Sequence, residues 1–148
     1  MSRWGPVVAW ASVIWVFSTD SFRGEETSEI LGPVLAILLP WADAEQLRIA
    51  HALARKLAHV TEYGILAALV VRALHSSEAS LARTVLGAIA LSATYAATDE
   101  LHQSFVASRT GAVSDVLLDT LGASLGAAVA GWWLARSVRI DDRHLDRA

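Results

Sequence analysis

The sequence predicts an all-α fold: an integral membrane bundle of four transmembrane helices, with a short interfacial or re-entrant segment between helices 1 and 2. Hydrophobic residues make up 54% of the 148 positions and charged residues only 18%, against about 25% charged in an ordinary soluble domain. The apolar residues also gather into four nearly uncharged stretches, at 4–19, 57–71, 84–98 and 120–135. The helices of a soluble bundle, the lesser alternative, would carry charges every three or four residues.

Composition also excludes several classes of protein. The chain has no Cys, so it is not a disulfide scaffold, and its net charge of −3 disfavours binding to nucleic acid. Its length fits one domain, 1–148.

The first helix is expected at about 4–20. It is interpreted as a retained span, because Trp10, Trp15 and Phe17 stand where a signal peptide would need small residues before cleavage. The next apolar run, 30–42, contains Pro33 and Pro40 and is too short and broken to span. It is therefore the expected interfacial or re-entrant segment.

The remaining helices are expected at about 55–74, 84–104 and 113–136, followed by a charged cytoplasmic tail at 137–148. A stretch of 15 or 16 apolar residues gives only about 24 Å of helix, whereas a bilayer core is about 30 Å thick. Each span must therefore include polar neighbours at one end.

The distribution of Lys and Arg predicts the orientation. Four spans leave Arg3, Arg72, Arg83, Arg136, Arg139, Arg143 and Arg147 on one side, and Arg23, Arg48, Arg55, Lys56 and Arg109 on the other. The excess, in short loops and a tail, favours cytoplasmic termini in a multi-pass plasma-membrane protein.

With this orientation, the polar residues of all four helices fall toward the same, outer, end. An ionised group in hydrocarbon costs about 2.5–3.5 kcal/mol and needs a partner or a wet cavity, so we expect one buried polar cluster that opens outward. Asp115 and Asp119 share a helix face with Gly122 and Gly126, a G-x-x-x-G step that lets another helix approach closely.

Two runs carry a family resemblance. The segment from Arg55 to Gly64 (RKLAHVTEYG) and the segment from Tyr95 to Val106 (YAATDELHQSFV), with Asp119 further on, resemble the motifs of the VanZ-like family of small integral membrane proteins. The resemblance covers nearly the whole chain. It implies a role in resistance to glycopeptide antibiotics of the teicoplanin type.

The residues themselves leave three functions open. In an enzyme, the cluster would perform acid/base chemistry on a lipid-linked or amphiphilic substrate at the outer leaflet. The alternatives are a non-catalytic site that binds a lipid-linked cell-wall precursor or a lipoglycopeptide, and an ion-pair network that fixes helix register. The candidate catalytic residues are His59, Glu62, Asp99, His102 and Asp119, and the candidate substrate-binding residues are Arg55, Lys56, Tyr63, Tyr95, Glu100, Gln103, Arg109 and Asp115.

We expect no cofactor, although a divalent metal is a minor possibility. His59, Glu62, Asp99 and His102 have the H-x-x-E and D-x-x-H spacings found among carboxylate and histidine ligands in helical bundles. No other metal-binding signature accompanies them.

Overall fold

The described part of the chain is all helical. The computed structural model describes residues 2–18, 24–76, 79–105 and 113–145, which hold five helices and no strand. The helices are α1 (Gly5–Phe17), α2 (Gly24–Leu38), α3 (Ala44–Leu74), α4 (Leu81–Ser104) and α5 (Val113–Leu145). The all-α prediction is confirmed.

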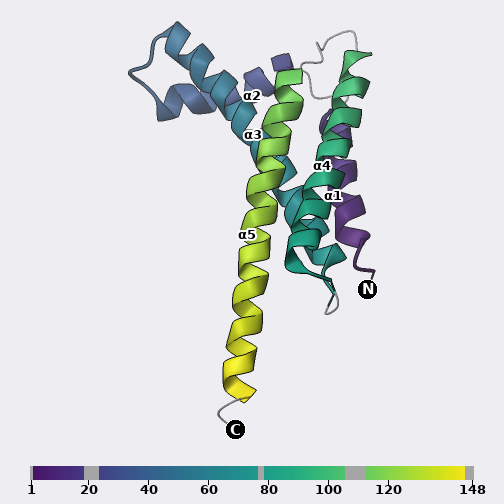
Figure 1. Ribbon diagram of the computed structural model, residues 1–148. Helices are drawn as coiled ribbons and strands as arrows, with labels where there is room; N and C mark the ends of the chain where they lie inside the picture. Colours follow the sequence, from purple (N-terminus) through teal and green to yellow (C-terminus); the bar gives the residue numbers. More distant parts are fainter. Residues whose placement is uncertain (1, 19–23, 77–78, 106–112, 146–148) are drawn as a thin grey trace.

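Helices α1, α3, α4 and α5 pack as a bundle, with neighbours in the chain running in opposite directions apart from the α2 insertion (Figure 1). The start of α1 and the end of α5 therefore lie toward the same end of the bundle. The core contains small side chains, among them Ala67, Ala88, Ala123 and Ala127, together with the larger Tyr63 and Ile14.

Three of these helices are long and apolar enough to cross a membrane: α3, α4 and the part of α5 from Val113 to Ser137. Helix α1 is apolar but has only 13 residues, about 20 Å of helix. The four-span count and the re-entrant segment therefore remain expectations.

Helix α3 begins well before the expected boundary at 55. Asp43 and Gln46 form a capping box: the Gln46 N–H donates to Asp43 Oδ1 at 2.8 Å, and the Asp43 N–H donates to Gln46 Oε1 at 3.0 Å. This pair satisfies two of the unpaired N–H groups at the helix start. The residues from Ala44 to the expected start at 55 are therefore helical as well.

The segment between α1 and α3 also differs in detail from the expectation. Residues 24–38 form α2, which continues through Pro33, and α2 and the first part of α3 project away from the rest of the bundle (Figure 1). Ile37 and Trp41 are largely exposed there. Helix α5 likewise continues to Leu145, into the region expected to be a charged tail.

Helices α3 and α5 approach each other closely at their glycines. A Cβ added at Gly122 would lie 2.8 Å from Val60 Cα, and one added at Gly126 would lie 2.6 Å from Gly64 Cα. Real side chains do not fit at such distances. The expected close packing at the G-x-x-x-G step is thus confirmed, with Val60 and Gly64 as its partners on α3.

Candidate functional site

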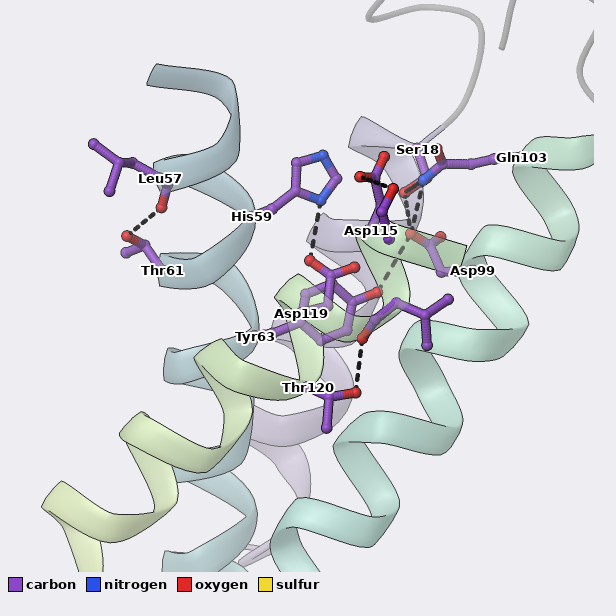
Figure 2. A network of polar contacts seen from close by, with 12 residues as sticks. Ser18, Leu57, His59, Thr61, Tyr63, Asp99, Gln103, Asp115, Asp119 and Thr120 are labelled. Carbon is purple, nitrogen blue, oxygen red and sulfur yellow. Dashed lines mark hydrogen bonds and ion pairs between the residues drawn. The ribbon is translucent and has the colours of Figure 1, made fainter. Parts of the chain in front are cut away.

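The polar site is centred on a contact between α3 and α5. His59 Nδ1 lies 3.3 Å from Asp119 Oδ1, and the side chain of Asp119 is only 2% exposed while that of His59 is 22% exposed. Figure 2 shows the second ring nitrogen of His59 on the side away from Asp119. A carboxylate at Nδ1 favours the tautomer with a proton there, which leaves Nε2 as the basic nitrogen.

A cavity of about 250 Å³ adjoins this pair. His59 lines it together with Arg55 and Lys56 from α3 and Asp115 from α5. Arg55 and His59 share a face of α3 because they are four residues apart. The cavity is large enough for a compact charged head group, to which Arg55 offers a guanidinium and Lys56 an amino group.

The position of the cavity along α5 can be compared with the thickness of a membrane. Asp115 precedes the exposed Trp133 by 18 residues, or about 27 Å of helix, close to the about 30 Å of a bilayer core. If Trp133 marks one interface, the cavity lies near the other, with Asp119 about one turn deeper than Asp115.

A second network surrounds Asp99 on α4, which is 2% exposed. Its Oδ2 accepts hydrogen bonds from Ser18 Oγ at 2.7 Å, Gln103 Nε2 at 3.0 Å and the Tyr63 hydroxyl at 3.3 Å (Figure 2). The donors belong to α4, to α3 and to the residue that ends α1. The network therefore joins three helices through one carboxylate.

Two further contacts tie α1 to the bundle. The Tyr95 hydroxyl donates to the carbonyl oxygen of Ala11 at 2.7 Å, and Trp10 Nε1 donates to the carbonyl oxygen of Glu62 at 2.9 Å. Tyr95, expected to bind substrate, is thus engaged with the backbone of α1.

His102 lies in a different environment from His59. Its ring stacks on Trp15 of α1, with the ring centroids 4.3 Å apart and the planes at 26°. This stacking gives His102 a packing role at the α1–α4 contact.

The structure therefore divides the expected cluster into two networks. His59, Asp119, Arg55, Lys56 and Asp115 gather at the α3–α5 cavity, whereas Asp99, Tyr63 and Gln103 gather beside the end of α1. Glu62 is half-buried on α3 and Glu100 is buried on α4. Arg109 lies outside the described residues.

The four residues named as possible metal ligands, His59, Glu62, Asp99 and His102, form no metal-binding group among the described residues. In the ranges that the structure describes, no three His, Asp or Glu side chains come close enough to hold a metal ion. His59 contacts Asp119, while His102 stacks on Trp15.

Two participants, Ser18 and Trp15, were not among the candidate site residues, although Ser18 belongs to the polar end of the first apolar run. Ser18 is buried at the end of α1 and donates to Asp99. Both stand where an apolar helix reaches its polar end, which is the only sequence signal for them. Their partners are more than 80 residues away in the chain.

Comparison with known families places the sequence in one of them. The sequence profile described as VanZ/LLP1 matches residues 4–142, almost the whole chain. The protein therefore belongs to the VanZ/LLP1 family of membrane proteins. No curated protein and no solved structure matches the chain significantly.

Proposed function

We propose that the protein binds the anionic head group of a lipid-linked or amphiphilic molecule in the cavity beside His59 and performs acid/base chemistry on it. The observation that carries this proposal is the His59–Asp119 contact at the wall of a cavity that is also lined by Arg55 and Lys56. A histidine without a carboxylate partner, or an ion pair remote from any cavity, would not support it.

Each side chain has a distinct role in this proposal. The guanidinium of Arg55 and the ammonium of Lys56 attract and orient a phosphate or carboxylate. Asp119 holds the His59 ring so that Nε2 accepts a proton from the reacting group or its attacking water. Asp99, with its three donors from the protein, is a positioning residue that keeps the helices in place.

We further propose that this end of the bundle faces the outer leaflet of the plasma membrane and that both termini are cytoplasmic. The parallel directions of α3 and α5 and the common end of the termini support an even number of spans (Figure 1). The excess of Arg at the other end supports the orientation.

The ligand class follows from this location and from the family. A lipid-linked cell-wall precursor and a lipoglycopeptide both present polar groups at the outer leaflet while an apolar part stays in the membrane. In cells, the activity would lower susceptibility to teicoplanin, as the resemblance to VanZ-like proteins implies.

A non-catalytic binding protein is the second candidate. The cavity itself favours it, because Arg55 and Lys56 would hold an anion there whether or not His59 transfers a proton. A structural polar cluster would differ from both, since it would bind nothing.

Binding is tested by the thermal shift that a ligand causes in detergent-purified protein. The ligands are a lipid-linked cell-wall precursor and teicoplanin. Arg55→Gln should reduce the shift, whereas Arg48→Gln is the matched control, because Arg48 pairs with Glu45 on the same helix and does not line the cavity. An equal shift in both variants would contradict the proposed site.

A further inference from the structure

A second, larger cavity lies along the α3–α5 seam, toward the other end of the bundle. Its volume is about 560 Å³, and it shares no lining residue with the cavity at His59. Its lining residues include Ile65, Ala68, Arg72, Leu125, Val129 and Trp133.

The glycine contact between the helices gives this cavity its shape. Gly64, Gly122 and Gly126 line it without side chains, while Ile65, Leu125 and Val129 are exposed around it. It extends from the level of Val60 to that of Arg72, 12 residues along α3, or about 18 Å. One leaflet of a bilayer core is about 15 Å deep, so the groove has the length of one acyl chain.

The groove ends at a positive charge. Among the described residues that line it, Arg72 alone is charged, and it is exposed in the last turn of α3. One of its N–H groups lies 3.4 Å from the carbonyl oxygen of Arg3, which uses one of the five donors of a guanidinium.

The residues near the Arg72 end of the groove are of the types found at a membrane interface. Trp133 lines the groove there, and one turn further along α5 the Arg136 guanidinium lies 5.4 Å from the Trp132 ring centroid. Trp and Arg in this arrangement are typical of the boundary between hydrocarbon and head groups.

We infer that this groove binds an anionic phospholipid of the leaflet at the Arg72 end, with its phosphate on Arg72 and one acyl chain along the α3–α5 seam. The site is independent of the proposed function at His59. A second copy of the chain fits less well, because a two-fold axis along the membrane normal would bring the two Arg72 residues to the same depth beside each other. Their like charges would repel, whereas a lipid phosphate complements them.

The test compares lipids and variants on the full chain purified in detergent. The probe is the rise in melting temperature caused by phosphatidylglycerol relative to phosphatidylcholine of the same chain length. Arg72→Gln removes the charge, and its control Arg83→Gln removes an exposed Arg at the same end of the bundle that does not line the groove. Val129→Trp fills the groove, and its control Ala128→Trp adds the same bulk at the adjacent exposed position of α5.

We expect Arg72→Gln to weaken phosphatidylglycerol binding about fivefold, Val129→Trp to abolish the preference, and both controls to keep it. Ala68→Trp provides a second way to fill the groove from α3. If Arg72→Gln and Arg83→Gln weaken binding equally, the attraction is a diffuse surface effect and the inference is wrong. The inference is also wrong if the groove-filling variants keep the lipid preference and the wild-type protein is a dimer that these variants convert to a monomer. In that case a second copy of the chain occupies the groove.

Discussion

His59 and Asp119 meet across the α3–α5 interface at 3.3 Å, immediately beside the point where the backbones of these helices come closest. Val60, next to His59, packs on Gly122, one turn beyond Asp119. The glycine contact therefore sets the separation of the two polar side chains. A change in helix spacing at Gly122 or Gly126 should alter the geometry of the site.

Gly126→Ala tests this coupling. The new Cβ would lie 2.6 Å from Gly64 Cα, so the backbones must separate, and overpacking of this kind costs about 1–3 kcal/mol of unfolding free energy. We expect lower stability in detergent and a weaker ligand-induced thermal shift. Gly87→Ala is the control, because its Cβ would meet only Leu74 Cδ1, at 3.4 Å. Equal stability of the two variants would contradict the tight α3–α5 contact.

Asp99→Ala tests whether the second network is structural. It removes the acceptor that Ser18, Tyr63 and Gln103 share, while Gln103 Nε2 keeps its contact with Ser18 Oγ at 3.4 Å. A buried donor that loses its acceptor costs about 1–3 kcal/mol. We expect a loss of about 3 kcal/mol or more in unfolding free energy. Thr94→Ala on the same helix should change little, since Thr94 is exposed and donates to its own helix at Ala90. A stable Asp99→Ala protein without activity would instead make Asp99 a functional residue.

His102→Phe separates the roles of the two histidines. Phe keeps an aromatic ring against Trp15 but cannot transfer a proton. We expect wild-type stability and protection against teicoplanin in this variant, whereas His59→Phe should lose protection. The measurement is the susceptibility of cells expressing each variant at matched protein levels. Loss of protection with His102→Phe at unchanged stability would restore His102 as a candidate catalytic residue.

Single cysteines test the orientation, because the chain has none of its own. Ser114 and Ser137 are both exposed, near opposite ends of the apolar part of α5. A membrane-impermeant maleimide should label Ser114→Cys in intact cells and Ser137→Cys only after permeabilisation. The reverse pattern would place the His59 cavity on the cytoplasmic side.

The fold could be predicted from sequence because hydrophobic runs without charge have few alternatives to membrane-spanning helices. The spacing of Asp119, Gly122 and Gly126 likewise indicated one packed face. The start of α3 was harder to predict from the sequence, because the residues after Asp43 are polar and only the capping box with Gln46 signals a helix there.

The sequence could predict which residues belong to the polar site, but not which of them contact one another. Helical spacing places residues on a face, but it does not say which residue of another helix each one contacts. His59 and His102 have similar surroundings in the sequence, yet one contacts Asp119 and the other stacks on Trp15. That difference depends on how α1 and α5 pack on opposite sides of the site, which is a tertiary property.

The most direct test of the proposed chemistry uses Asp119→Asn, which keeps the shape of the side chain and removes its charge. We expect this variant to melt within a few degrees of wild type, to retain the thermal shift caused by a lipid-linked precursor, and to give cells no protection against teicoplanin. Binding without protection would locate the chemistry at the His59–Asp119 pair. Full protection in the variant, or a large fall in melting temperature with no ligand response in the wild type, would contradict the account.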